Sequence, residues 1–170
     1  MKRIKCHSSY RRYQGLDGDE ISELVCQSHS CILHDFIKQK DDDSQITTIA
    51  TIPQLRMTRK IIGEYILDDK EMQTRFEDSI GLVSDWRKRG SVYEVPFRTL
   101  YNRKIKNLIF AGRITSVTES MWDIMRVIPC CAITGEAAGI AASMTDDVTL
   151  LDIFKLQDEL EQRGVKIHIA

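Results

Sequence analysis

Apolar residues at helical spacing form the first clear pattern of the chain, over residues 19–40. Their three- and four-residue spacing places them on one face of an amphipathic helix. The positions are Ile21, Leu24, Val25, Cys31 or Ile32, and Phe36. Asp17 or Asp19 can cap the start of this helix. The stretch 41–44, three aspartates and Ser44, forms a solvated turn after it.

The next apolar pattern is that of β-strands. Residues 46–52 and 55–67 are rich in β-branched and alternating side chains, and Pro53 separates the two runs. The pattern predicts two strands, or one long bent strand. In the second run Arg59 shares a face with the apolar odd-numbered positions, so its guanidinium needs a carboxylate or an anionic ligand.

Two roles for Arg59 follow from that placement. It can form a structural ion pair with Glu64, Asp78 or Asp85, or it can anchor an anionic substrate. The alternation places Arg56 on the opposite face, so at most one of the two arginines reaches a given site.

The remaining pattern completes an α+β fold, with a mixed or antiparallel sheet and flanking helices. A short helix is expected to begin at Asp68 and Asp69 and to carry Met72, Phe76 and Ile80. A strand over 92–100, which Pro96 interrupts, should follow it. The last expected elements are a helix over 150–160 that ends at Gly164 and an edge strand over 165–169. Proline lacks an N–H group for the ladder, and glycine commonly follows the end of a helix.

Residues 107–144 predict a strand, a polar turn and a helix, and the rest of the chain is organised around them. The strand is the apolar run 108–111, and Pro129 suits the first turn of the helix. Small residues recur every four positions along this helix, at Cys131, Gly135, Gly139 and Ser143. Each glycine inside a helix costs roughly 1 kcal/mol relative to alanine. We therefore expect a sheet, another helix or a flat ligand to lie close to that face.

Four motifs in this chain resemble those of a family of FAD-dependent oxidoreductases. They are R-x-T-R with G-x-Y at 56–65, F-x-D-S-I-G at 76–81, Y-x-V-P-F-R-x-L at 93–100, and N-L-x-x-A-G-R with R-V, P and G-x-A-A-G-x-A-A over 107–142. They occur in the family's order over about half of the chain. The resemblance implies that residues 107–170 are the C-terminal part of an FAD-binding domain, and that residues 1–106 are an α+β portion on the substrate side.

The resemblance also implies the residues of the site. The strand, loop and helix would complete a Rossmann-like domain and contact FAD. The residues expected at the cofactor are Ala111, Gly112, Arg113, Arg126, Gly135, Ala137, Ala138 and Gly139. Arg59 and Tyr65 are the candidates for the substrate side. A cation or a helix N-terminus near the flavin stabilises its reduced, anionic form.

One feature of the family is missing from the sequence. The chain contains no G-x-G-x-x-G pattern, whose backbone amides hold the pyrophosphate of a dinucleotide. The first function that follows is a portion of an oxidoreductase for a small-molecule substrate, which needs a separate N-terminal dinucleotide-binding half. The alternative is a non-catalytic α+β interaction or remnant domain that self-associates through an exposed apolar patch.

Composition narrows the classes of protein to which the chain can belong. Hydrophobic residues make up 42% and charged residues 29% of the 170 positions, as in globular domains. The formal net charge is −1 with basic residues scattered, which argues against nucleic-acid binding. We expect no membrane span, no metal and a cytoplasmic protein with reduced cysteines; the set Cys26, His29, Cys31 and His34 is the minor metal alternative.

Overall fold

The computed structural model describes residues 13–51 and 55–169 and divides the chain into two compact units, residues 1–58 and 59–170. In the first unit, α1 (Gly18–Gln39) confirms the predicted amphipathic helix. The Asp17 carboxylate caps it by accepting hydrogen bonds from the amides of Asp19 and Glu20, both at 3.0 Å.

The strand predicted at 46–52 is wrong over its described part, 46–51, which has no strand; Ile52 and Pro53 lie outside the described residues. Residues of this stretch are largely exposed. Its contact with α1 is made by a side chain, since the ring Nε2 of His29 lies 2.8 Å from the carbonyl oxygen of Ala50. A segment bonded through side chains in this way lacks the backbone ladder of a sheet.

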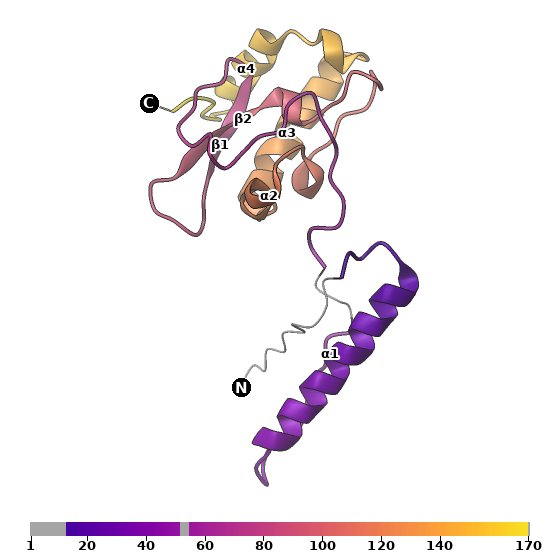
Figure 1. Cartoon of the computed structure of the whole chain (residues 1–170). Coiled ribbons are helices and arrows are strands. Elements are labelled where there is room, and N and C mark those ends of the chain that lie inside the picture. The colour runs from indigo at the N-terminus through magenta and orange to yellow at the C-terminus, as the bar shows by residue number, and fades with distance from the viewer. Residues whose placement is uncertain (1–12, 52–54, 170) are drawn as a thin grey trace. The chain divides into compact units, whose positions relative to one another are not determined.

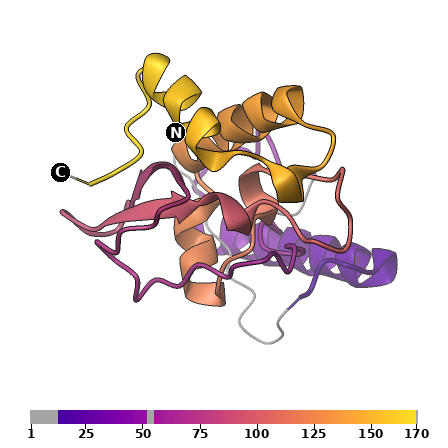
Figure 2. The ribbon, with the colours of Figure 1, turned by 90° about the horizontal axis from the view of Figure 1, so that it is seen from above.

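The second unit contains an antiparallel hairpin with helices beside it, which confirms an α+β fold (Figures 1 and 2). Its elements are the strands β1 (Ser79–Ser84) and β2 (Val92–Pro96), the helices α2 (Glu119–Met125), α3 (Ile128–Met144) and α4 (Ile153–Gln162), and short 3-10 turns at Phe97–Thr99, Gly112–Ile114 and Val148–Leu150. Both α3 and α4 contact β1. The predicted helices over 129–144 and 150–160 are confirmed.

The strand predicted at 55–67 is wrong. Its backbone bonds to two different segments: the amide of Ile61 donates to the carbonyl of Ile114 at 2.9 Å, and that of Glu64 donates to the carbonyl of Tyr101 at 3.0 Å. A strand needs one continuous partner, and here only the isolated bridge between Leu67 and Val117 forms.

The short helix predicted after Asp68 is also wrong. The Glu71 carboxylate accepts from the amide of Asp68 at 2.8 Å, and Gln73 adopts a positive φ of 58°, which a right-handed helix does not allow. Ile80 belongs to β1 instead. The predicted strand over 92–100 ends at Pro96, where a 3-10 turn follows.

Two more predicted strands are absent. Residues 108–111 make a single bridge, from Ile109 to Tyr101, before the chain turns at Gly112. Residues 165–169 pair with no strand: the amide of Val165 donates to the carbonyl of Leu160 at 3.0 Å, and that of Ile169 donates to the Glu94 carboxylate at 3.0 Å. The helix α2 is an element that was not predicted, although Thr118 is a suitable cap and apolar residues follow it.

The core of the second unit lies where the hairpin meets α2, α3 and α4. Its largest fully buried apolar side chains are Leu67, Ile80, Leu100, Met121, Ile124, Met125, Leu156, Leu160, Val95 and Val117. Gly81 permits the closest approach of β1 to α3, because a Cβ there would lie 2.5 Å from a methyl of Ile133. Ala137, Ala138 and Ala141 are buried on the same helix. Close packing of α3 on β1 therefore uses its alanine face.

Gly63 marks a second close approach. A Cβ at this position would lie 2.9 Å from Cβ of Ser116 and 3.0 Å from the carbonyl oxygen of Arg98. Both neighbours belong to the segments to which residues 61–67 bond. The absence of a side chain at Gly63 therefore lets this segment reach its two partners.

We expect Gly63→Ala to lower the free energy of unfolding by about 1–3 kcal/mol, because the added methyl overpacks against backbone atoms. Gly135→Ala is the matched control in α3, where an added Cβ meets nothing within 4 Å. It should raise stability by up to about 1 kcal/mol through helix propensity. Urea unfolding followed by circular dichroism measures both. Equal stabilities of the two variants would contradict the close approach at Gly63.

A buried carboxylate ties the hairpin to the C-terminal segment. Glu94 is 1% exposed and accepts hydrogen bonds from the amides of Phe76 at 2.8 Å and Ile169 at 3.0 Å, and from His168 Nδ1 at 3.0 Å. Burial alone raises the pKa of Glu94, but these hydrogen bonds outweigh it and hold the pKa below its usual range. The ionised form is therefore the one the fold stabilises.

Glu94→Gln tests this linkage. A folded-state pKa below the ordinary value of about 4.3 means that Glu94 stabilises the fold above that pH and loses its contribution as the pH falls through the folded pKa. We expect wild type to exceed the variant in unfolding free energy at pH 7, and the difference to shrink in acid. Urea unfolding at a series of pH values measures it; a difference that does not depend on pH would contradict the assignment.

Candidate functional site

The turn at Gly112 and the first half of α3 form one continuous surface. Gly112 has a φ of 73°, and its amide donates to Thr134 Oγ1 at 2.9 Å. Thr134 Oγ1 in turn donates to the carbonyl of Cys130 at 2.8 Å. A Cβ on Gly112 would lie 3.7 Å from Cys131 Sγ. The structure thus brings together two of the segments that the resemblance places at the cofactor.

The predicted small face of α3 divides into two sides. Ala137 and Ala138 are buried, as is Thr134, and face the interior of the unit. Gly135 and Gly139 are exposed, and a Cβ added at either would meet nothing within 4 Å. The expected close neighbour of the two glycines is therefore absent among the described residues.

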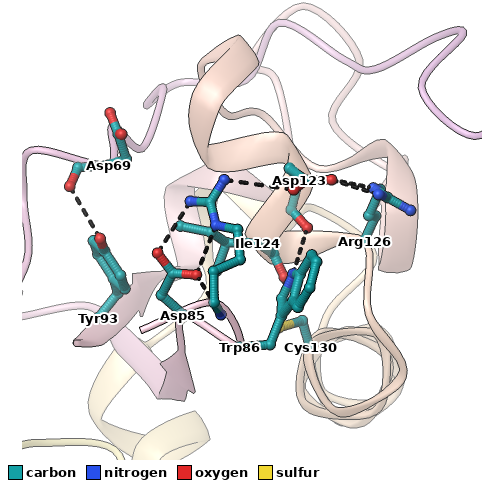
Figure 3. Close-up of polar contacts among 9 residues, drawn as sticks. Asp69, Asp85, Trp86, Tyr93, Asp123, Ile124, Arg126 and Cys130 are labelled. Carbon is teal, nitrogen blue, oxygen red and sulfur yellow. Dashed lines mark hydrogen bonds and ion pairs between the residues drawn. The ribbon is translucent and has the colours of Figure 1, made fainter. Parts of the chain in front are cut away.

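Arg126 belongs to a network of ion pairs at the corner between α2 and α3 (Figure 3). Its Nε donates to the Asp123 carboxylate at 2.8 Å, and Arg87 approaches the same carboxylate at 3.4 Å. Trp86 Nε1 donates to the carbonyl of Asp123 at 3.2 Å. The contacts of Trp86 and Arg87 connect the loop between β1 and β2 with α2, and Arg126 binds the Asp123 carboxylate that Arg87 also approaches.

Arg87 also holds the buried carboxylate of Asp85. Its Nε and Nη2 donate to the two oxygens of Asp85 at 2.8 and 3.0 Å. These hydrogen bonds hold the pKa of Asp85 below its usual range, although burial opposes the shift. The second expected cation, Arg113, is different: its side chain is exposed, and its carbonyl accepts from Trp122 Nε1 at 2.7 Å.

Tyr65, the first substrate-side candidate, is held on several sides. Its hydroxyl donates to the Glu71 carboxylate, Phe76 packs edge-on with ring centroids 5.4 Å apart, and the Arg98 guanidinium lies 4.9 Å from its ring centroid. Burial, followed by the hydrogen bond to Glu71, raises the pKa of Tyr65 to about 12. The hydroxyl is therefore protonated at neutral pH and serves as a donor.

Arg59, the second substrate-side candidate, is exposed, so its expected place on an apolar face is wrong. Its segment is an irregular run bonded to two partners, and strand alternation therefore does not apply to it. The carboxylates expected beside it pair with other arginines: Glu64 with Arg103 at 3.3 Å, Asp78 with Arg98 at 2.9 Å and Asp85 with Arg87 at 2.8 Å.

Arg98 forms an ion pair that was not predicted. Its Nε and Nη2 donate to the two oxygens of Asp78 at 2.9 and 3.1 Å, and its backbone amide donates to the same carboxylate at 3.1 Å. Asp78 and Arg98 each belong to one of the quoted motifs, F-x-D-S-I-G and Y-x-V-P-F-R-x-L. The sequence therefore contained a signal for this ion pair, because Asp78 and Arg98 carry opposite charges within two of the motifs.

Over residues 13–51 and 55–169, no group of three His, Cys, Asp or Glu side chains could hold a metal ion. No single described helix is long and apolar enough to span a membrane. The pair α2 and α3 meets such a criterion together by length and composition, but the two helices are bent by 88°.

We expect Thr134→Val to loosen the turn at Gly112, because valine keeps the shape of threonine but cannot accept the amide hydrogen bond. The free energy of unfolding should fall by about 1 kcal/mol, and hydrogen exchange of the Gly112 amide should become faster. Ser143→Ala is the control, because the Ser143 hydroxyl bonds only within its own helix turn, to Ile140, at an exposed position. Unchanged exchange at Gly112 in Thr134→Val would contradict the bond.

Comparison with known proteins finds a family whose members are similar to part of this chain. Residues 83–160 match the model of the family described as FAD dependent oxidoreductase. No curated protein and no solved structure matches the chain. The match begins in β1, ends in α4 and includes both the turn at Gly112 and the whole of α3. The match supports a similarity of this part of the chain to FAD-dependent oxidoreductases, and it covers the quoted motifs at 93–100 and 107–142.

Proposed function

We propose that residues 107–144 form one wall of an FAD site in an oxidoreductase. The Gly112 turn and the exposed side of α3 would lie against the cofactor, and residues 59–65 would contribute to the pocket of a small-molecule substrate. The family match supports a flavoprotein-like region.

The open glycines of α3 carry the proposal. Gly135 and Gly139 each cost the helix roughly 1 kcal/mol relative to alanine. Neither is required by packing within the described residues, since a Cβ at either position meets nothing within 4 Å. A flat group that approaches the backbone from outside the unit is a physical reason for both glycines, and the flavin ring is such a group.

Arg113 is the cation beside this surface that would stabilise an anionic flavin. Its exposed side chain follows Gly112 directly, and the turn is bonded to Thr134 of α3. Arg126 is bound to Asp123, so we assign it to the α2–α3 corner and not to the cofactor. Bound FAD would accept two electrons from the substrate. Tyr65 would supply a hydrogen-bond acceptor to the substrate side, because its one hydroxyl proton is donated to Glu71.

The site is incomplete in this chain alone. With no G-x-G-x-x-G pattern in the sequence, the pyrophosphate of FAD needs another segment to bind its charge. We propose that a separate N-terminal dinucleotide-binding half supplies it, and that the assembled enzyme is cytoplasmic. Gly112, Arg113 and the α3 glycines would then contact the flavin end of the cofactor.

A flavin titration tests the proposal. The purified chain is mixed with FAD, and quenching of flavin fluorescence is followed to saturation. Gly139→Leu should weaken binding at least tenfold, because its side chain fills the space against the helix backbone. Gly18→Leu is the matched control, since Gly18 is also helical and a Cβ there also meets nothing within 4 Å. Equal FAD binding by Gly139→Leu and Gly18→Leu would contradict the proposed wall, whereas no quenching by wild type would mean that the chain does not hold FAD without the separate half.

A second candidate is a non-catalytic interaction domain that self-associates. Several large apolar side chains favour it: Ile128 is 85% exposed, Leu150 77%, Ile62 76% and Phe154 68%. Exposed apolar groups of this size are typical of surfaces that bind a protein partner. This candidate predicts association of the chain without any response to FAD, whereas the flavin proposal predicts saturable quenching.

A further inference from the structure

Lys60 is a half-buried cation that has no acidic partner in the described part of the chain. Only three lysine and arginine residues there are half-buried as whole residues, and the other two are Arg98 and Arg126. Arg98 pairs with Asp78 at 2.9 Å, and Arg126 pairs with Asp123. A cation taken partly out of water is normally paired with an anion. Lys60 is therefore the exception among these three residues.

Neutral groups hold the Lys60 side chain in place. Its Nζ donates a hydrogen bond to the carbonyl of Val117 and lies 5.0 Å from the ring centroid of Trp122, which is a cation–π distance. Trp122 is itself fixed, because it is 5% exposed and its Nε1 donates to the carbonyl of Arg113 at 2.7 Å. Neither partner of the ammonium carries a negative charge. The cation is thus positioned without being neutralised.

These contacts leave the ammonium group able to bind a further acceptor. A lysine ammonium has three N–H donors. One is used by the carbonyl of Val117, and a second faces the ring of Trp122 at most. A ligand oxygen with negative charge would accept the remaining N–H and also balance the charge, which makes it a stronger partner than a neutral group. A carboxylate has the single negative charge that one cation can balance.

Lys60 also lies against the turn that carries the proposed flavin surface. The next residue, Ile61, donates from its amide to the carbonyl of Ile114 at 2.9 Å. Trp122, which contacts the ammonium, bonds to Arg113 in the same turn. Lys60 belongs to residues 59–65, the segment proposed for the substrate pocket. Its cation is therefore placed where a substrate beside the flavin would meet it.

We propose that Lys60 binds the carboxylate of a small organic acid, which makes organic acids the substrate class of the proposed site. Lys60, and not the exposed Arg59, is then the anchor for an anionic substrate. The word substrate rests on the proposed function. The binding itself does not, because the groups that hold Lys60 all belong to this unit and require neither FAD nor a separate half.

Titration of the full chain with acetate, followed by the indole N–H signals of tryptophan in nitrogen–proton NMR spectra, tests the proposal. The chain has two tryptophans, and Trp86→Phe identifies which signal is which. The Trp122 signal should shift saturably as acetate replaces chloride at constant ionic strength. The Trp86 indole, which donates to the carbonyl of Asp123, is the internal reference and should not shift. Acetamide, which has the shape of acetate without its charge, should have no saturable effect.

Two variants assign the response to Lys60. Lys60→Gln removes the charge but keeps a donor for Val117, and it should raise the Kd for acetate at least about tenfold. Lys104→Gln is the matched control, because it removes the same charge from an exposed residue and should leave the Kd unchanged. The backbone amide signals of each variant show whether it is folded.

The proposal is supported by a saturable shift of the Trp122 signal with acetate that is weakened in Lys60→Gln and kept in Lys104→Gln. It is overturned by the absence of a saturable shift in wild type, by an equal shift with acetamide, or by equal Kd values for wild type and Lys60→Gln. The first two outcomes need no variant to fold. No sample contains FAD, so a failure here is separate from a failure of the flavin titration.

Discussion

The second unit depends on the close packing of α3 against β1. Gly81 gives the strand a bare backbone where Ile133 reaches it, and Ala137, Ala138 and Ala141 give the helix a flat side. Helix and strand therefore approach more closely than larger side chains would allow. This packing fixes the rotation of α3 about its own axis, and in that rotation Gly135 and Gly139 face outward.

A set of charged pairs then fixes the loops around this core. Asp78 and Arg98 join the start of β1 to the turn after β2, while Asp85, Arg87 and Asp123 join the hairpin loop to α2. Most of these groups are partly buried and make two or more hydrogen bonds each, which gives them defined geometry. Motif residues shared with a redox family thus serve the fold, and a motif match alone does not make a residue part of the reaction.

The sequence predicted the helices better than the strands, and the reasons are local. Asp17, Pro129 and Gly164 are start and stop signals that act within a few residues, so α1, α3 and α4 were foreseen. The runs at 55–67 and 108–111 have strand composition, but a strand also needs a partner, and their partners are short or alternate between segments. The wrong expectation that Arg59 shares an apolar face has the same cause, because it assumed strand alternation over 55–67. For the candidate site, the adjacency of Gly112 and α3 was implied by the resemblance, whereas the pairing of Arg126 with Asp123 needed the structure.

The outward glycines have a consequence for how the sequence changes over generations. Within the described residues nothing touches a side chain at position 135 or 139, so the fold of this chain exerts no packing pressure against alanine, serine or larger residues there. Gly81 and Gly63 are under such pressure from Ile133 and Ser116. In a lineage that no longer uses the surface of α3, the first two glycines should drift while the last two persist. The pattern of variation at these four positions is therefore a record of whether that surface is still in use.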